Sequence, residues 1–386
     1  MRLLVAGGGT GGHLFPGIAV AEEFLARDSS NEVLFVGTDR GIEARVVPRL
    51  GFRLEFIDAA GIRGKGIFSQ LKGLSMLLYG YAQSRKILKA FRPDRVLGVG
   101  GYASGPVVLA ARGMQIRRYI HEQNAIPGMT NKVLARFVEE IFISLDESQK
   151  FFPKGKTLVT GNPVRREILA AAGAPADSPL GHPLTEGGNG GGFDREGSPS
   201  ARRDFRLLIF GGSAGAHSVN QAVMEALPHL RGYRDKLVVL HQTGENDLAE
   251  VRQAYGSEGF KAEVVPFIDD MAGAYLGASL VVCRAGATTI AEVTACGKAC
   301  VFIPYPHAVD DHQRRNAEAL LKKGAGFMLL ERELSGENLA RMIVNLMEHP
   351  EQVAAAGGNA RELARLDAAK VIVDEMMNIE ARGTRL

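Results

Sequence analysis

The sequence has little of what marks several large classes of protein. Its formal net charge is only +3 over 386 residues, which makes no electrostatic case for binding nucleic acid. It has no uninterrupted run of about 18 apolar residues, so we expect no membrane-spanning helix. The N-terminus leads at once into an aliphatic strand, Leu3–Ala6, with no signal peptide before it. We therefore expect a cytoplasmic protein, for which attachment to a membrane surface stays open.

Cysteine is also scarce. The chain has three, Cys283, Cys296 and Cys300, all in one late segment. The number is odd and no spaced Cys/His set accompanies them, so we expect neither a disulfide framework nor a zinc site. Neighbouring carboxylates such as Asp269 and Asp270 do not by themselves make a metal site. We predict that the cysteines are small buried residues in a reducing compartment.

The length and the pattern of apolar residues predict two α/β domains. Single cores stop growing near ~250–300 residues, and short aliphatic runs alternate here with helical patterns, which is typical of parallel sheets. The strands expected in the first half are residues 3–6, 33–36, 54–57, 96–99, 119–121, 141–143 and 158–160. Those expected in the second half are residues 207–210, 237–241, 263–265, 280–283, 301–303 and 327–329.

The division of the chain follows from a break in composition. Residues 171–204 are rich in Gly, Pro, Ser and Ala and nearly free of large apolar side chains, so they cannot offset their ordering entropy by burial. We predict a first domain over residues 1–165, a flexible linker over 166–205 and a second domain over 206–358. A C-terminal helix over 359–386 would pack back on the first domain.

Each half opens with a strand followed directly by a glycine loop, Gly7–Gly12 and Gly211–Ala216. Such a loop points backbone N–H groups at a common centre next to a helix N-terminus, which suits an anion or a sugar. The first loop satisfies the dinucleotide fingerprint G-x-G-x-x-G, which also requires an acidic residue at the end of the second strand. That strand ends at Val36, and Asp39 comes late. A nicotinamide dehydrogenase is therefore an inferior hypothesis.

The stretch Arg284–Glu292 is a better candidate for a nucleotide site, since it follows a buried strand and opens a helix. Thr288 and Thr289 fall in the first turn, where hydroxyl and N–H groups can hold a diphosphate. The Glu292 carboxylate could accept hydrogen bonds from both ribose hydroxyls. An ordinary capped helix, with Thr as cap, explains the same residues equally well.

The segment Gly8–Gly17 resembles the N-terminal loop of the MurG family of glycosyltransferases, which convert lipid I to lipid II. The resemblance covers nearly the whole chain, and the long 171–204 insertion departs from it. Further segments agree in order and spacing: 61–66, 98–106, 121–124, 161–165, 211–216, 267–271, 284–292 and 311–313.

The resemblance implies the GT-B architecture, two Rossmann-like doubly wound α/β domains with an interdomain cleft. It implies inverting transfer of N-acetylglucosamine from UDP-GlcNAc, bound mainly by the second domain, to the muramyl 4-hydroxyl of lipid I, bound by the first. It implies no metal and no cofactor. The expected setting is peptidoglycan synthesis for cell shape and division, at the cytoplasmic face of the inner membrane. Expected partners are an anionic membrane surface and other cell-wall synthesis proteins, with no nucleic acid.

The resemblance also implies roles for individual residues. Backbone groups of Ile268 would read the uracil, Glu292 would hold the ribose, and Asn124 and Gln313 would bind sugar hydroxyls. Arg165 would lie near the nucleotide. The residues expected to contact UDP-GlcNAc are Thr10, Gly11, Gly12, Asn124, Arg165, Ser213, Ile268, Ala287, Thr288, Thr289, Ile290, Ala291, Glu292 and Gln313.

Transfer requires a base for the acceptor hydroxyl. His13, at the start of a helix, is the first choice, because the helix N-terminus disfavours its cationic form. A hydrogen bond to substrate and a capping role remain alternatives for His13, and Glu122 is the second candidate base. Backbone N–H groups after Gly286 and around Ser213 would stabilise the leaving UDP. His217, His241 and His307 are expected to be structural.

Residues 67–81 place apolar side chains at helical spacing, from Ile67 to Tyr81, among several lysines and arginines. A basic amphipathic helix of this kind can lie in an anionic membrane interface. The pattern alone favours a helix that faces the core. The lipid-linked acceptor that the resemblance implies makes the two interpretations about even. Other functions left open are a transferase with another acceptor, a sugar-nucleotide epimerase, and a nucleotide-binding module without catalysis.

Overall fold

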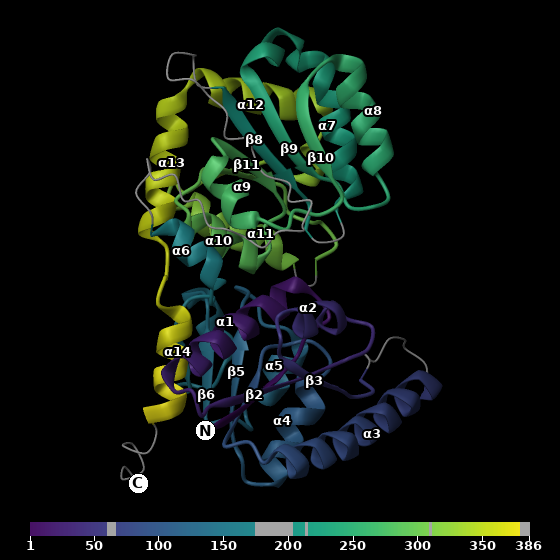
Figure 1. Cartoon of the computed structure of the whole chain (residues 1–386), viewed down its shortest axis with the longest axis vertical. Coiled ribbons are helices and arrows are strands. Elements are labelled where there is room, and N and C mark those ends of the chain that lie inside the picture. Colours follow the sequence, from purple (N-terminus) through teal and green to yellow (C-terminus); the bar gives the residue numbers. More distant parts are fainter. Residues whose placement is uncertain (60–66, 174–203, 213–214, 309–310, 379–386) are drawn as a thin grey trace. The chain divides into compact units, whose positions relative to one another are not determined.

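The computed structural model describes residues 1–59, 67–173, 204–212, 215–308 and 311–378, and of residues 67–75 only the helical backbone. The chain forms two compact units (Figure 1). Unit 1 comprises Met1–Arg166 and the C-terminal residues from Arg365, and unit 2 comprises Glu167–Ala364.

Unit 1 is built on a seven-stranded parallel sheet with the strand order β3-β2-β1-β4-β5-β6-β7. The strands are β1 Arg2–Ala6, β2 Glu32–Gly37, β3 Arg53–Phe56, β4 Arg95–Gly98, β5 Arg117–Glu122, β6 Glu140–Ile143 and β7 Thr157–Val159. The helices are α1 Gly11–Arg27, α2 Glu43–Arg49, α3 Ile67–Phe91, α4 Ser104–Gly113, α5 Met129–Leu134 and α14 Ala368–Asn378, with the 3-10 helix η1 Asp146–Phe151.

Both faces of this sheet are buried, because successive side chains of a strand point to opposite faces. Leu3 and Val5 of β1 pack with residues of α1 and α14, including Ile372. Leu4 and Ala6 pack on the opposite face, with residues of α3 and α4. The continuous aliphatic strands that the sequence showed are thus the centre of a doubly covered sheet.

Unit 2 repeats the plan with a six-stranded parallel sheet, order β10-β9-β8-β11-β12-β13. The strands are β8 Phe205–Phe210, β9 Leu237–Gln242, β10 Lys261–Val265, β11 Leu280–Cys283, β12 Cys300–Phe302 and β13 Phe327–Met328. The helices are α6 Arg166–Ala172, α7 His217–Leu230, α8 Leu248–Glu258, α9 Met271–Gly277, α10 Ala287–Ala295, α11 His312–Leu321, α12 Gly336–Glu348 and α13 Pro350–Glu362, with 3-10 helices η2 Arg231–Lys236 and η4 Glu331–Glu333.

The order of each sheet reverses beside its first strand. In unit 1 the chain runs outward from β1 through β2 and β3 and then returns to β4 on the other side. Unit 2 does the same at β8, with β9 on one side and β11 on the other. Doubly wound sheets bind ligands outside the carboxyl ends of the strands at such a reversal. The glycine loops after β1 and β8 both lie at these positions.

The predicted linker and C-terminal helix differ in detail from the structure. Residues 166–172, expected in the flexible linker, form helix α6, because Ile168 and Ala171 are buried. Residues 174–203 lie outside the described part of the chain. The expected helix from residue 359 is two helices, since α13 ends at Glu362 and α14 begins at Ala368.

Helix α14 lies beside α1 within unit 1 (Figure 1). The Arg27 guanidinium forms an ion pair with Asp374 at 2.8 Å, and Arg95 Nε donates to the carbonyl of Met376 at 2.9 Å. Among the described helices, none is both long and apolar enough to cross a membrane.

Candidate active site

Two glycine loops of unit 1 press against each other at the carboxyl ends of β1 and β4. A Cβ atom on Gly7 would lie 2.4 Å from the carbonyl oxygen of Gly100, and one on Gly101 would lie 2.5 Å from that of Gly8. All four glycines have positive φ angles, from +78° to +147°, which L side chains rarely adopt. Only glycine allows this approach of backbone to backbone, so the loops form one surface.

A buried carboxylate that the sequence analysis missed holds the first of these loops. Glu43 Oε2 accepts from the Gly9 N–H at 2.7 Å, while Oε1 accepts from the N–H and hydroxyl of Thr38 at 2.9 and 3.1 Å. Glu43 is 1% exposed. The N–H of Gly9 is therefore bonded to an internal anion, which argues against a dinucleotide pyrophosphate at that position. An acidic residue a few positions after β2 was the only signal in the sequence.

His13 is the third residue of α1, directly beside these loops. Its Nδ1 lies 3.1 Å from Gln123 Oε1, and a Cβ on Gly100 would lie 2.7 Å from the same Nδ1. The missing side chain of Gly100 therefore makes room for the imidazole. The structure brings His13 of α1 together with the loops that follow β4 and β5.

Glu122, the second candidate base, lies at the end of β5 and is 1% exposed. Its Oε1 accepts from the backbone N–H and side-chain amide of Asn124, at 3.0 and 3.3 Å. Its Oε2 accepts from the Gly128 N–H and from Asn131 Nδ2, at 3.1 and 2.9 Å. Four donors thus engage the carboxylate, which shapes the loop carrying Asn124 rather than facing a substrate. This geometry disfavours Glu122 as the base.

The remaining candidates of unit 1 lie close to His13 in the chain or in space. Thr10 is the exposed N-cap of α1 without a side-chain cap bond, and Gly11 and Gly12 follow in the first turn. The Arg165 guanidinium lies 4.7 Å from the ring centroid of Phe15 of α1. A cation over an aromatic face is held in place there.

In unit 2, helix α10 begins directly after β11. Its N-cap is Gly286, with no side-chain cap bond, so neither Thr288 nor Thr289 is the cap that an ordinary capped helix would require. Ala287, Thr288 and Thr289 form the first turn, followed by Ile290 and Ala291. The Glu292 carboxylate is 4% exposed and accepts a hydrogen bond from the Tyr275 hydroxyl at 3.1 Å.

Two further donor-site candidates belong to the loops at the ends of β8 and β10. Ile268 is fully buried, and its N–H donates to Gln242 Oε1 at 2.8 Å. Gln242 Nε2 in turn donates to the Gly212 carbonyl at 2.8 Å, so this one side chain joins the β10 loop to the second glycine loop. Ser213 lies outside the described residues.

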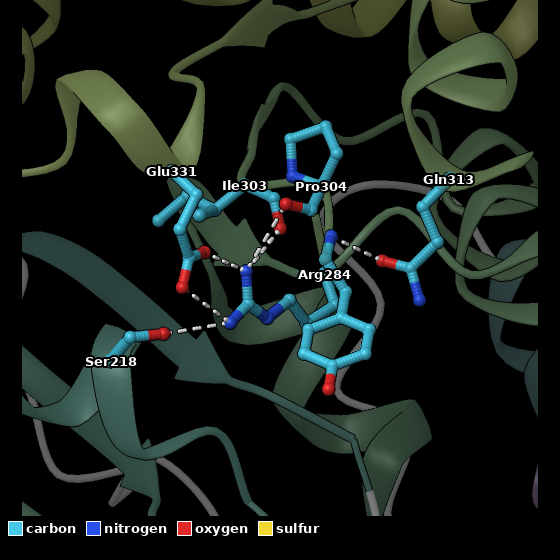
Figure 2. A network of polar contacts seen from close by, with 7 residues as sticks. Ser218, Arg284, Ile303, Pro304, Gln313 and Glu331 are labelled. Carbon is cyan, nitrogen blue, oxygen red and sulfur yellow. Dashed lines mark hydrogen bonds and ion pairs between the residues drawn. The ribbon is translucent and has the colours of Figure 1, made fainter. Parts of the chain in front are cut away.

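Figure 2 shows a polar network that centres on Arg284, directly after β11. Its guanidinium forms an ion pair with Glu331 and donates to Ser218 Oγ at 2.8 Å and to the carbonyls of Ile303 and Pro304 at 3.1 and 3.3 Å. The sequence analysis included Arg284 in the loop but gave it no role.

The same network reaches Gln313 in α11. The Arg284 guanidinium carbon lies 5.5 Å from the Tyr305 ring centroid, and the Tyr305 N–H donates to Gln313 Oε1 at 3.0 Å. This bond occupies the amide oxygen of Gln313 and directs its amide nitrogen elsewhere. Arg284 therefore links α7, η4 and the β12 loop, and through that loop it orients Gln313.

Two other histidines, His121 and His241, are buried. Burial lowers the pKa of His241 to about 3 and that of His121 to about 4, so both are neutral near pH 7. His241 Nε2 lies 3.0 Å from Asn220 Oδ1. No group of three or more His, Cys, Asp or Glu side chains in the described residues could hold a metal ion.

Two doubly wound parallel units, each with a glycine loop at its strand-order reversal, define a GT-B-like fold. The Acinetobacter baumannii MurG crystal structure matches the chain with a TM-score of 0.73 and 29% identity, over 98% of this chain and 99% of that one. A Neisseria meningitidis UDP-GlcNAc 2-epimerase, bound to UDP-GlcNAc, matches with a TM-score of 0.64 over 98% and 100% of the chains. Its 12% identity shows the shared fold alone.

Sequence comparisons identify the family to which the chain belongs. The models for the glycosyltransferase family 28 N-terminal and C-terminal domains match residues 3–143 and 206–375. The UDP-N-acetylglucosamine--N-acetylmuramyl-(pentapeptide) pyrophosphoryl-undecaprenol N-acetylglucosamine transferase of Geotalea uraniireducens is 64% identical over 381 residues, 99% of each chain. The protein of that name from Geobacter metallireducens is 65% identical over 378 residues, 98% of each chain. This chain therefore belongs to glycosyltransferase family 28, in its MurG group, which confirms the predicted resemblance and fold class.

Proposed function

We propose that the chain transfers N-acetylglucosamine from UDP-GlcNAc to the muramyl 4-hydroxyl of lipid I, with inversion at the anomeric carbon, and so makes lipid II for peptidoglycan. One observation carries the proposal: 64% identity over 99% of the chain with a relative whose name states this donor and this acceptor. The arrangement of polar groups at the two strand-order reversals supports it.

Unit 2 is the proposed donor unit. The first turn of α10, residues 287–289, offers backbone N–H groups and two hydroxyls to the diphosphate, and these stabilise the charge on leaving UDP. Glu292 holds the ribose, and the Ile268 carbonyl reads the uracil, since its N–H is already bonded to Gln242. Gln313 binds a sugar hydroxyl through its amide nitrogen, because Tyr305 engages its oxygen.

Unit 1 is the proposed acceptor unit, with His13 as the general base. His13 takes the proton of the 4-hydroxyl as that oxygen attacks the anomeric carbon and the bond to the UDP oxygen breaks. The imidazole lies in the first turn of α1, and in its neutral form it has one nitrogen that can accept a proton. In this proposal Asn124, which is hydrogen-bonded to Glu122, binds a sugar hydroxyl. Arg165, which stacks on Phe15, lies near the nucleotide.

We also propose that unit 1 binds an anionic membrane through α3, at the cytoplasmic face of the inner membrane. Leu78 and Tyr79 are 63% and 59% exposed, and Arg85, Lys86 and Lys89 on the same helix are exposed cations. Tyr81, in contrast, packs against the core of unit 1, and Ile67, Leu71 and Leu74 have no described side chains. Exposed apolar side chains beside cations suit an interfacial helix.

The membrane proposal is tested by sedimentation with vesicles that contain phosphatidylglycerol. The double variant Leu78→Glu/Lys86→Glu should lose binding, whereas Lys261→Glu in unit 2, an exposed charge reversal of the same kind, should retain it. Each basic residue near an anionic surface contributes about 1 kcal/mol. Equal binding by the wild type and the double variant would contradict the proposal.

Transfer itself is tested with radiolabelled UDP-GlcNAc and a short-chain lipid I analogue, in the presence of EDTA. The wild type should form labelled disaccharide. His13→Ala should lose about 100-fold or more in rate, the usual contribution of a general base, with UDP binding retained. His229→Ala, an exposed histidine of α7, is the matched control and should remain active. Folded wild type that binds UDP but transfers nothing to this acceptor would refute the assignment.

A further inference from the structure

Gln123 is a buried side chain, 1% exposed, that lies between two histidines and has no role in the proposed reaction so far. The orientation of its amide is set by the backbone. Nε2 lies 2.8 Å from the carbonyl oxygen of Val99, and only the amide nitrogen can donate a proton to a carbonyl. The amide oxygen must therefore be the atom that faces His13.

This orientation determines which nitrogen of His13 carries the proton. Gln123 Oε1 lies 3.1 Å from His13 Nδ1, and an amide oxygen only accepts hydrogen bonds. The contact is a hydrogen bond only if Nδ1 is protonated. A neutral imidazole has one N–H, so Nε2 of His13 then bears the lone pair.

The second amide proton of Gln123 sets the other histidine in the opposite way. Nε2 lies 3.1 Å from His121 Nδ1, which must accept. His121 then carries its proton on Nε2, which lies 3.3 Å from both the Gly161 carbonyl and Ser144 Oγ. One amide thus joins the β4 loop, β5 and α1 in a single consistent set of donors and acceptors.

We propose that Gln123 is a positioning residue that holds His13 in its Nδ1–H tautomer, with the Nε2 lone pair directed to the acceptor hydroxyl. This inference rests on the proposed role of His13 as base. Nε2 takes the hydroxyl proton while the new C–O bond forms, and the electron pair of the broken bond leaves with UDP. The imidazolium so formed keeps its Nδ1–H bond to Gln123. Because the amide is neutral, it orients the ring without stabilising the cation as a carboxylate would.

The tautomer is measured directly by NMR on protein labelled with ¹⁵N-histidine, at a pH where the ring is neutral. His13→Ala identifies the His13 signals by their loss. We expect a protonated Nδ1 and an unprotonated Nε2 for His13, and the reverse for His121. A His13 proton on Nε2 would overturn the proposal.

The catalytic effect is measured from the pH profile of kcat/KM. Gln123→Glu places a carboxylate beside Nδ1, which favours the protonated ring that cannot act as a base. The acid limb should therefore move to higher pH by about one unit, with about tenfold lower activity on the acid side. Ser144→Ala is the matched control, since it removes a contact on the far side of His121. That control should leave the limb in place, whereas a limb unmoved in Gln123→Glu would overturn the proposal.

A third variant, Gln123→Met, keeps the volume and removes both the acceptor and the donors. It should lower kcat about tenfold, mix the His13 tautomers in the NMR spectrum, and leave KM for UDP-GlcNAc unchanged. Failure of the proposed base role can be distinguished from failure of the proposed role of Gln123. Full activity in His13→Ala would refute the base role, even if the His13 ring carries its proton on Nδ1. An inactive His13→Ala with an Nε2–H ring would instead refute the role of Gln123 alone.

Discussion

The pair Arg284–Glu331 supports an asymmetric prediction: removing Glu331 should destabilise unit 2 more than removing Arg284. The Arg284 side chain is 9% exposed and that of Glu331 23%. When Arg284 is replaced, the remaining carboxylate can recover part of its hydration. When Glu331 is replaced, the remaining charge is the more deeply buried one, with two carbonyls and one hydroxyl as its partners.

The magnitudes follow from these contacts. Arg284→Met keeps the apolar stem of the side chain. It leaves two carbonyls and the Ser218 hydroxyl without a donor, a cost of about 2–3 kcal/mol after the partial rehydration of Glu331. Glu331→Ala leaves an uncompensated buried charge, for which about 3–5 kcal/mol is typical. We therefore expect a difference of about 1–2 kcal/mol between the two variants.

Hydrogen exchange of peptides from β11 and α10 is the suitable assay, because it reports the local free energy of opening within unit 2. A pH series adds a second check. Burial alone would raise the pKa of Glu331, but hydrogen bonds from Arg284 and Ser218 together with the Arg284 charge hold it below its ordinary value. Its stabilising contribution is thus present above about pH 4.3 and lost as the pH falls through the lower folded value. The advantage of the wild type over Glu331→Gln should shrink in that range.

The polar network around Arg284 should also affect the binding of the donor sugar. Because Arg284 orients Gln313 through Tyr305, Arg284→Met should weaken binding of UDP-GlcNAc by about tenfold and that of UDP much less. Ser218→Ala, which removes one contact on the far side of the guanidinium, is the control. Equal costs for the two charge-removing variants, or the reverse order, would refute the burial argument. An equal loss of UDP and UDP-GlcNAc affinity would refute the link to the sugar.

Three further predictions concern single features. Gly100→Ala should lower the rate of transfer by more than tenfold, since its Cβ would lie 2.7 Å from the imidazole of the proposed base. Gly51 is the control, because its φ is +79° and a Cβ there would meet nothing within 4 Å. Gly51→Ala should lower the stability of unit 1 only by the backbone strain, ~1–3 kcal/mol. Glu43→Gln should destabilise unit 1 by about 2–3 kcal/mol in chemical unfolding, nearly as much as Glu43→Ala. The reason is that the amide NH2 group would face the backbone N–H of either Gly9 or Thr38, where a donor meets a donor. The pKa values of buried His121 and His241, about 4 and about 3, lie below the ordinary 6.5, so the unfolded chain binds more protons below that pH. Stability should therefore fall from pH 6.5 toward pH 4 by up to about 1.4 kcal/mol per pH unit for each histidine, and His241→Phe should flatten that slope in calorimetry.

The predicted strands agree with the sheets because periodicity and composition are local properties. Continuous aliphatic runs, such as Leu3–Ala6, can only be buried on both faces, and glycine clusters after a strand mark a backbone turn near a ligand. The linker was wrong over residues 166–172, because the two apolar residues that bury this short helix give no clear pattern in seven residues.

The sequence by itself determined the fold class, the family and the position of the glycine loops, since all of these are encoded in order and spacing along the chain. Only the tertiary structure decided which side chains face one another. It turned the Glu122 carboxylate toward its own loop, brought Glu43 to the Gly9 N–H, and placed Gln123 between two histidines. These contacts join residues as much as 110 positions apart. Donors and acceptors that meet by the packing of separate strands leave no period or motif in the sequence, so their roles become visible only when the sheet is formed.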